Sequence, residues 1–419
     1  MIVRKIEGTK RNKLSGGNMR NSFIKEAAYP HNVKWDKMIS REVENDKEDN
    51  IRSDFELDYN RILHTTAYRR LKHKTQVFYA PKNDHICTRI EHVNHVESIS
   101  YTIAKYLGLN TELTRAIAVA HDLGHSPFGH KGEKLLSEIT EKDIGEKFWH
   151  ERNGLNLVDN TELLQDYNHN RKNLNLTYAV RDGIISHCGE IDENALKPRE
   201  EYINLETEYT YPNEYAPYTW EACVVKISDK ISYIGRDIED AITLGILEED
   251  LEELHQILNL PPEEPINNGI IIRELIQDIC DNSSLEKGLC FSPKSLEKIN
   301  KLKAFNYKHI YEINKFNRST KYLELLVNEI YSILKSTYSK ENTLQELQKL
   351  EKEYPEIISR FIDWISAYWN LTDRTNTNLK NKVLYNMNNE KDYYRAIISF
   401  ISGMTDNYAM KLFDAIIGF

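Results

Sequence analysis

The chain has 419 residues, of which 55 are Lys or Arg and 65 are Asp or Glu, so its formal charge is −10. A negative balance of this size gives no overall attraction to nucleic acid or to anionic lipid. The five cysteines include no CxxC pair, which argues against a disulfide framework or a cysteine zinc site and predicts a cytoplasmic protein. No apolar run approaches the length of a membrane span, so we expect no membrane partner.

Residues 1–20 are rich in Lys and Arg and lack an apolar segment. We predict a basic, disordered N-terminal tail, or a stretch that lies upstream of a true start at Met19 rather than Met1. The alternative is an arm with weak affinity for single-stranded DNA.

Helical periodicity dominates the remaining chain. Residues 111–125 have apolar side chains spaced for one buried face, and Thr111 is the N-cap expected from the sequence. Residues 221–246 extend the same pattern over some six turns, and Gly245 can end that helix. Sustained alternation of apolar and polar residues is scarce, so we predict an all-α fold.

The later part of the chain is also helical, with amphipathic patterns over residues 319–339 and 354–370. A Pro-rich connection at residues 259–269 is the expected boundary between an N-terminal body and a C-terminal helical region. We predict a catalytic core over residues 21–258 and a helical C-terminal region over residues 259–419, which packs on the core and closes its ligand site.

Two stretches lack the helical pattern of apolar residues. Residues 74–80, "KTQVFYA", form the best short extended segment, although a loop is equally compatible with them. Residues 194–219 are rich in Tyr and Glu and predict a long ordered loop or a short hairpin.

The stretch "AHDLGHSPFGHKGE", residues 120–133, concentrates polar chemistry. His121 and His125 are four residues apart, as in helical zinc-protease sites. Gly124 lies between them and Pro127 follows at once, so the helix ends at this motif and cannot present both rings to one zinc ion. The protease interpretation is therefore weak.

The adjacent pair His121 and Asp122 suits a different metal site. His92, on an upstream helix, and Asp229, on the apolar face of a downstream helix, can close around the pair. Two imidazoles and two carboxylates without a thiolate favour a hard to borderline divalent ion that keeps open positions for water and phosphate.

These residues belong to blocks that resemble the HD superfamily of metal-dependent phosphohydrolases, and within it the bacterial dGTPase-like deoxynucleoside triphosphate (dNTP) triphosphohydrolases. The matched blocks follow the family's order through residues 54–245 and 393–409. They are "RILHTTAYRRLKHKTQVF", "TRIEH", "AHDLGHSPFGHKGE", "SDKISYIGRDIEDAI" and "FISGMTDNYA". The resemblance implies an HD-domain helical core with additional C-terminal helices.

The resemblance also implies the activity, which is metal-dependent hydrolysis of a dNTP at the α-phosphorus to a deoxynucleoside and inorganic triphosphate. The metal ligands that it implies are His92, His121, Asp122 and Asp229. The ion can be Mn, Mg, Fe, Co, Ni or Zn. His95 does not match a ligand position of the family, and we expect it to support its neighbours or to be structural.

The family's reactive groups match residues that follow the His-Asp pair. His130 and Glu133 resemble a His–acid dyad, in which the acid orients the imidazole. His125 resembles a phosphate-contacting histidine, and His150 completes the reactive wall. Whether water or His130 makes the first bond to phosphorus stays open.

The substrate side is implied in the same way. Gln76 and Val77 match positions that contact the deoxyribose, and Arg89 and Lys230 match phosphate-binding residues. Asp229, Tyr233 and Asp237 are spaced i, i+4, i+8 and therefore form one helical stripe, in which the family's Tyr and Asp face the sugar.

One block departs from the family. The positions before "ISGMTD" are usually Asp-Tyr, and here they are Ser399 and Phe400. The preferred base is therefore left open, together with the subunit contacts normally made there. Kinship further implies a homo-oligomer, tetramer or hexamer, with a second dNTP as an activator at a subunit interface.

Two rival functions remain. One is an HD nucleotidase or phosphodiesterase that acts on another nucleotide. The other is a nucleotide-sensing assembly whose HD site binds without turnover, although such sensors tend to lose ligands and this ligand set is complete.

Overall fold

A computed structural model describes residues 22–43, 51–78, 83, 85–188, 194–247, 251–312, 317–370 and 377–418. The tail predicted over residues 1–20 lies outside these residues, and so does the choice between Met1 and Met19. Within the described residues, no helix is long and apolar enough to cross a membrane.

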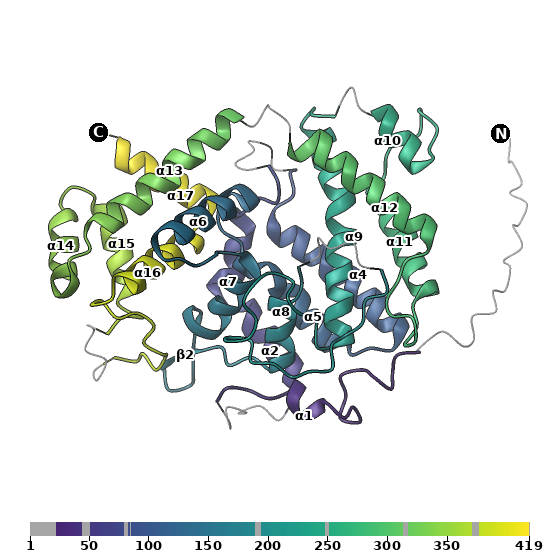
Figure 1. The fold of residues 1–419 in the computed structure, drawn as a ribbon, viewed down its shortest axis with the longest axis horizontal. Helices are drawn as coiled ribbons and strands as arrows, with labels where there is room; N and C mark the ends of the chain where they lie inside the picture. The colour runs from purple at the N-terminus through teal and green to yellow at the C-terminus, as the bar shows by residue number, and fades with distance from the viewer. Residues whose placement is uncertain are drawn as a thin grey trace, which may run out of the picture.

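The all-α prediction is confirmed, because the regular structure of the described residues is helical apart from one small antiparallel sheet (Figure 1). The helices of the first half are α1 (Trp35–Met38), α2 (Asp54–Leu63), α3 (Thr66–Arg70), α4 (Arg89–Leu107), α5 (Thr111–Ala120), α6 (Gly129–Asp143), α7 (His150–Asn156), α8 (Tyr178–Ile185) and α9 (Trp220–Thr243). The helices of the second half are α10 (Leu251–Leu258), α11 (Asn268–Asn282), α12 (Pro293–Asn306), α13 (Asn317–Ser336), α14 (Thr343–Leu350), α15 (Pro355–Ile365), α16 (Glu390–Ser402) and α17 (Asp406–Ile417).

Short elements connect them. The sheet pairs β1 (Leu163–Gln165) with β2 (Arg171–Asn173). The tight or wide helical turns are η1 (Leu71–His73), η2 (His121–Gly124), η3 (Leu157–Thr161), η4 (Tyr307–Tyr311) and η6 (Lys340–Asn342).

Local capping explains where the central helices begin and end. Thr88 begins α4 with a capping box, and Gly108 ends it at φ 83°. The prediction that Thr111 caps α5 is wrong. The side chain of Asn110 accepts hydrogen bonds from the amides of the first turn, and Thr111 is already helical. Helix α9 ends at Thr243, just before the glycine expected to stop it.

Helices α4, α5 and α9 pack together at the centre of the molecule. Helices α11 and α12 extend the apolar core on α9: Ile279 and Leu302 are buried in one cluster with Ile234. The chain beyond the Pro-rich connection therefore shares a core with the helices before it. The domain division at residues 258 and 259 stays a prediction.

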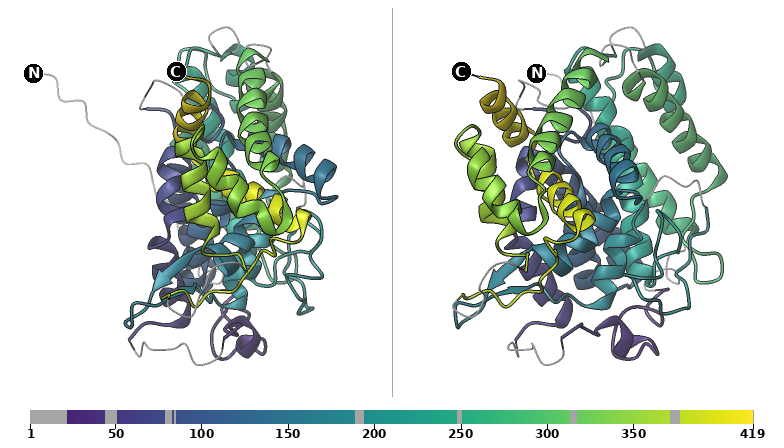
Figure 2. Two further views of the ribbon diagram at one scale, coloured as in Figure 1. Left: turned by 90° about the vertical axis from the view of Figure 1, so that its left-hand side faces the viewer. Right: turned by 60° about the vertical axis from the view of Figure 1, so that its left-hand side comes forward.

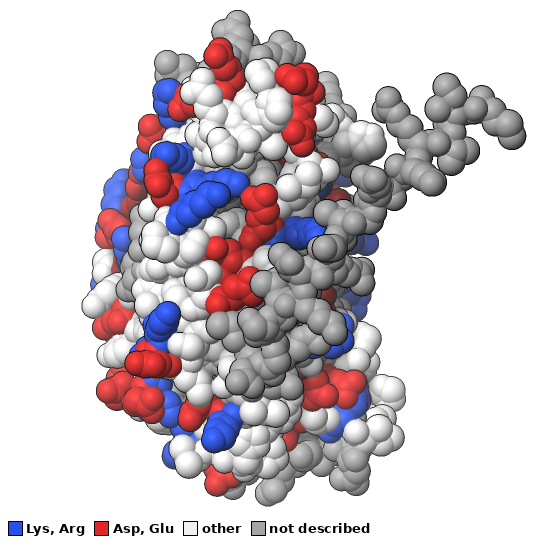
Figure 3. Space-filling view, turned by 90° about the vertical axis from the view of Figure 1, so that its right-hand side faces the viewer, with Lys and Arg blue, Asp and Glu red and all other residues white. Residues whose placement is uncertain are grey.

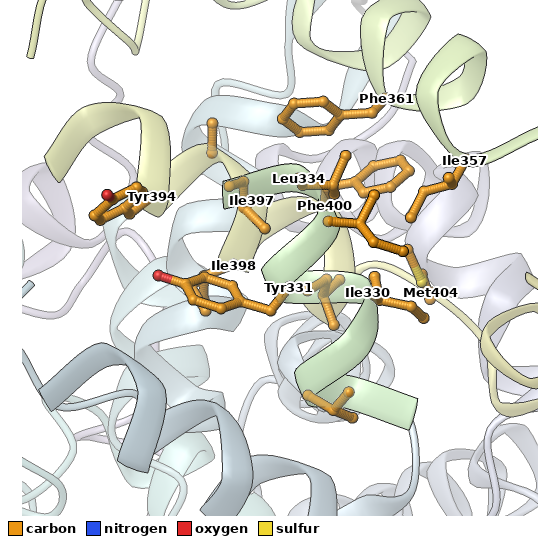
Figure 4. Packing of buried hydrophobic residues seen from close by; sticks show 14 of the residues in the cluster. Ile330, Tyr331, Leu334, Ile357, Phe361, Tyr394, Ile397, Ile398, Phe400 and Met404 are labelled. Carbon is orange, nitrogen blue, oxygen red and sulfur yellow. The ribbon is translucent and has the colours of Figure 1, made fainter. Parts of the chain in front are cut away.

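A second core joins the C-terminal helices to α6. Leu334 of α13, Phe361 of α15 and Phe400 of α16 are buried in it (Figure 4). Leu136 of α6 belongs to the same cluster. Figures 1 and 2 show these C-terminal helices gathered on one side of the molecule. Phe400, which departs from the family pattern, is thus a core residue here, and Ser399 accepts a hydrogen bond from Tyr385 at 3.0 Å.

The two non-helical stretches are loops. Of residues 74–80, only Thr75 forms an isolated bridge, with Thr88, and residues 79 and 80 lie outside the described part. Residues 194–219 form an irregular loop rather than a hairpin. That loop is ordered against α8, where Arg199 donates to the buried carboxylate of Asp182 at 2.5 Å.

The surface follows the mixed composition. On the face shown in Figure 3, Lys and Arg side chains are interspersed with Asp and Glu among the described residues. No large region of one sign is visible on that face, so it offers no continuous basic surface.

The second core makes a stability prediction. Leu326 of α13 is fully buried, whereas its neighbour Leu325 is 66% exposed. We expect Leu326→Ala to lower the free energy of unfolding by about 2–5 kcal/mol, because truncation leaves a cavity. We expect Leu325→Ala to change it by less than about 0.5 kcal/mol. Denaturant unfolding of both variants checks this, and equal losses would contradict the packing of α13.

Candidate active site

The backbones of η2 and α7 touch just after the His-Asp pair. Helix α5 ends at Ala120, and η2 carries His121 and Asp122. A Cβ atom at Gly124 would lie 2.0 Å from the carbonyl oxygen of His150 and 2.2 Å from the amide nitrogen of Gly154. Only glycine allows η2 to meet α7 so closely, and this contact brings the pair beside His150.

The structure brings together all four residues predicted as metal ligands. One ligand atom from each of His92, His121 and Asp229 lies within 4.8 Å of the others. His92 Nε2 is 2.9 Å from Asp229 Oδ1. Asp122 joins them, with its carboxylate oxygens 3.5 Å from His121 Nε2 and 3.8 Å from His92 Nε2. Helices α4 and α9 and the turn η2 thus converge on one buried point.

The protonation of this cluster suits a cation. His121 Nδ1 lies 2.7 Å from the carbonyl oxygen of Ala118, so it donates there and leaves Nε2 as a lone pair. That buried Nε2 has no hydrogen-bond partner among the described residues. Burial raises the pKa of Asp122, but His125, His121 and Arg89 together hold it well below its usual range. The Nε2 lone pair of His121 and the ionised carboxylate of Asp122 together form a donor set that fits a divalent ion.

A second group of histidines lies beside the cluster. Glu133 is placed between two rings, with Oε1 3.0 Å from His150 Nδ1 and Oε2 3.7 Å from His130 Nδ1. Burial lowers the pKa of His150, but Glu151 and Glu133 raise it to about 10. His150 is therefore an imidazolium at neutral pH. The His130 side chain is 69% exposed, so this ring can reach a ligand from solvent.

His125 differs from its neighbours in protonation. Burial, with Arg89 and His150, holds the pKa of His125 well below its ordinary value. Its Nε2 lies 3.1 Å from Asp122 Oδ1, and its ring stacks on His150 at 3.8 Å between centroids. A neutral His125 can donate this Nε2 proton to Asp122, which orients the carboxylate.

The residues predicted to face substrate include several buried polar atoms without a hydrogen-bond partner among the described residues. These are Gln76 Oε1, Arg89 Nε, Arg89 Nη2 and Asp237 Oδ1. Leaving such groups unpaired costs free energy in a finished core. Their presence beside the cluster is the pattern expected of a site that binds a polar ligand.

The remaining predicted residues lie on the same elements. Arg89 begins α4 and donates through Nη1 to Asp122 at 2.7 Å. Lys230 is buried on α9, Tyr233 is half-buried one turn further along, and Val77 is half-buried against the apolar core. His95 lies outside the metal-binding group.

Sequence reasoning missed two residues. The ring of His187 lies 5.0 Å from that of His121 and 5.3 Å from that of His150, and burial lowers its pKa to about 3. Tyr311, beyond the Pro-rich connection, donates to Asp237 at 2.5 Å. Both contacts depend on how distant helices pack, and no local spacing signals them.

One cavity of the described residues lies away from this site. It has a volume of 550 Å³ and lies between α7 and α16, where Trp149, Arg152 and Ser399 line it. None of the residues predicted for the active site lines this cavity. The orphaned polar atoms, rather than cavity size, therefore mark the candidate site.

Known families match the chain in two places. Residues 89–234 match the HD domain, and residues 342–415 match the phosphohydrolase-associated domain. A Caldanaerobacter subterraneus subsp. tengcongensis protein is 32% identical, over 92% of this chain and 91% of its own length. A Rickettsia prowazekii protein is 33% identical over 87% and 91% of the two chains. Both are named deoxyguanosinetriphosphate triphosphohydrolase-like protein.

The chain belongs to this HD-domain family. A third member, from Desulfatibacillum aliphaticivorans, is 35% identical over 66% of this chain and 73% of its own. The HD match begins at Arg89 and ends at Ile234, so it contains all four of the converging His and Asp residues. Membership supports a phosphohydrolase that acts on nucleotides, and the buried His/Asp cluster could bind the metal on which HD hydrolases depend.

The contact at Gly124 can be tested directly. We expect Gly124→Ala to lower the free energy of unfolding by about 1–3 kcal/mol, because the added carbon overlaps the backbone of α7. The matched control is Gly269→Ala, since a Cβ there would meet only the Asn267 side chain at 3.1 Å. Denaturant titration measures both, and an unchanged Gly124→Ala protein would contradict the close approach.

Asp240 generates a pH prediction. It accepts from the amide of Cys87 at 3.0 Å, just before α4 begins, and burial raises its pKa from 3.8 to about 7. The folded protein thus retains a proton that the unfolded chain releases between these values, so this carboxyl lowers stability as pH rises through that window. Asp240→Asn keeps the acceptor but does not titrate. We expect the melting temperature of Asp240→Asn, relative to wild type, to increase from pH 4 to pH 7; a difference independent of pH would contradict the raised pKa.

Proposed function

We propose that the protein hydrolyses deoxynucleoside triphosphates, in the manner of a dGTPase, at the α-phosphorus to a deoxynucleoside and inorganic triphosphate. The observation that carries the proposal is the placement of the exposed His130–Glu133 pair beside a buried set of two His and two Asp side chains. The printed names of the relatives support the same reaction.

In this proposal His92, His121, Asp122 and Asp229 hold one divalent ion. The unpaired Nε2 of His121 and the ionised state of Asp122 support that assignment. When bound, the ion supplies Lewis-acid polarisation of a phosphate oxygen. The choice among Mn, Mg, Fe, Co, Ni and Zn is left to measurement, because all of them accept nitrogen and oxygen donors.

His130 is the proposed proton donor to the departing 5′ oxygen. Its exposed ring can meet substrate, and Glu133 lies beside it, with Oε2 3.7 Å from His130 Nδ1. Nearby positive groups, foremost His150, outweigh the effect of burial and hold the pKa of Glu133 well below its usual range. His150 therefore anchors the carboxylate, and the carboxylate orients His130. His125 keeps Asp122 in place through its Nε2 proton.

The unpaired buried atoms of Gln76, Arg89 and Asp237 suit the phosphates and the sugar of a dNTP. The free donors of Arg89, with Lys230, would hold phosphate oxygens, since a guanidinium forms paired bonds to such anions. Gln76 and Val77 would contact the deoxyribose. Tyr233 and Asp237 would form the wall opposite, where Tyr311 already holds one oxygen of Asp237 and leaves the other for a hydroxyl.

Assembly remains part of the proposal. Family kinship supports a cytoplasmic homo-oligomer, tetramer or hexamer, with a second dNTP as an activator at a subunit interface. The base preference is open, because Ser399 and Phe400 replace the residues usual in the family.

The test is product identification. Purified protein is incubated with Mn²⁺ or Mg²⁺ and each dNTP, singly and in mixtures, and the products are separated by ion-exchange chromatography. We expect the deoxynucleoside and inorganic triphosphate, with mixtures exposing any activation. Monophosphate and pyrophosphate alone would point to an HD nucleotidase, and tight binding without products would point to a sensing assembly.

Two variants test the metal site without relying on turnover alone. Asp229→Asn is expected to lose bound metal in elemental analysis together with activity, because it removes one charged donor. His95→Gln, altered on the same face of α4 but outside the cluster, should retain both. Metal content that survives Asp229→Asn would contradict the proposed ligand set.

A further inference from the structure

Three segments that are far apart in the sequence meet at Asp406, the first residue of α17. Its carboxylate is 2% exposed. Oδ1 accepts the amide of Phe128 at 2.9 Å. Oδ2 accepts the amide of Thr75 at 3.2 Å and the hydroxyl of Thr75 at 2.7 Å. One carboxylate thus satisfies three donors from two other parts of the chain.

The first of these partners determines how α6 begins. Phe128 immediately precedes α6 and has φ 66°, a left-handed conformation that non-glycine residues rarely adopt. Its side chain is buried in the C-terminal core. Helix α6 presents His130 and Glu133 within its first turns. The bond from the Phe128 amide to Asp406 therefore holds the turn that directs both side chains.

The second partner lies next to a residue proposed to contact substrate. Thr75 directly precedes Gln76, and a Cβ at Gly129 would lie 3.1 Å from the Gln76 carbonyl oxygen and 3.6 Å from Arg89 Nη2. The start of α6, Gln76 and Arg89 are therefore in near contact. A shift of Thr75 relative to Phe128 would change how these groups lie relative to one another.

A neighbouring lysine crosses the same junction. Lys74 is 2% exposed, and its ammonium donates to the carbonyl oxygens of His125 and Ser402, the latter at 3.1 Å. Ser402 ends α16, and His125 follows the His-Asp pair. The end of α16 and the start of α17 are thus both tied to residues 125–128, which connect η2 to α6.

We propose that Asp406 is a positioning residue that links the C-terminal helices to the active site by holding Phe128 and Thr75 in fixed relation. It touches neither substrate nor metal in this scheme; it acts through His130 and Glu133 on one side and Gln76 on the other. The inference rests on the proposed function for the roles of those three residues. It assigns a task to the "GMTD" segment, to which the reaction itself gives none.

The decisive variant is Asp406→Asn in the full-length protein. The amide has one acceptor oxygen, so whichever way it turns, the bond to Phe128 or those to Thr75 are lost. We expect kcat for dNTP hydrolysis to fall about 10- to 100-fold, because small displacements of reacting groups cost rate steeply. Asp414→Asn is the matched control, with the same change on an exposed position of α17. It should leave kcat and KM unchanged.

Amide hydrogen exchange gives a readout that needs no activity. In Asp406→Asn, peptides that cover residues 74–78 and 126–133 should exchange about tenfold faster, while α9 keeps its wild-type protection. Wild-type kcat and local exchange would overturn the proposal. Faster exchange throughout the chain, with activity lost only in proportion to unfolded protein, would also overturn it. If wild type forms no triphosphate, the proposed function fails alone, and the exchange pattern still decides whether Asp406 holds the two segments.

Discussion

The active-site geometry depends on the contact between two backbones at Gly124 and Gly154. A side chain at Gly124 would separate η2 from α7, because a Cβ there would lie 2.0 Å from the His150 carbonyl oxygen and 2.2 Å from the Gly154 amide nitrogen. The contact is reinforced by Asn153, which donates to the Gly124 carbonyl oxygen at 2.7 Å. His121 and Asp122 therefore lie beside His150, and the proposed metal ligands and the proposed proton-transfer groups can share one site. The close approach is a steric constraint that fixes η2 against α7.

Charge pairing distinguishes the buried ion pairs that stabilise the fold from the groups that are proposed to bind a ligand. Arg181 binds both oxygens of Asp159 at 2.6 and 2.7 Å, and Arg199 donates to the buried Asp182. These buried pairs leave little capacity for further partners. Arg89, in contrast, uses one nitrogen on Asp122 and leaves Nε and Nη2 without partners among the described residues. The asymmetry is what a ligand site requires, because a finished core satisfies its buried donors.

The C-terminal helices contribute to the site as well as to the core. Helices α13, α15 and α16 bury a continuous apolar cluster against α6, and Tyr311 contacts the wall formed by α9. Since α6 carries His130 and Glu133, packing in that cluster bears on the position of the reactive side chains. Phe400, the departure from the family pattern, lies in the cluster against Phe361. Its hydrophobic side chain therefore serves packing of the C-terminal core.

The sequence by itself determined the helical class and the four residues that converge, because periodicity and the order of the blocks are local signals. It also placed the end of α9 to within a few residues, since glycine ends helices through its own backbone freedom. The sequence did not decide which of two adjacent polar residues caps α5. The side chain of Asn110 accepts hydrogen bonds from the first-turn amides, and that of Thr111 does not. Only the tertiary structure decided which polar atoms stay unpaired, which histidines carry protons, and how His187, Tyr311 and Asp406 reach the site. Those properties depend on contacts between residues up to 331 positions apart, and burial and packing at such separations leave no pattern in neighbouring residues.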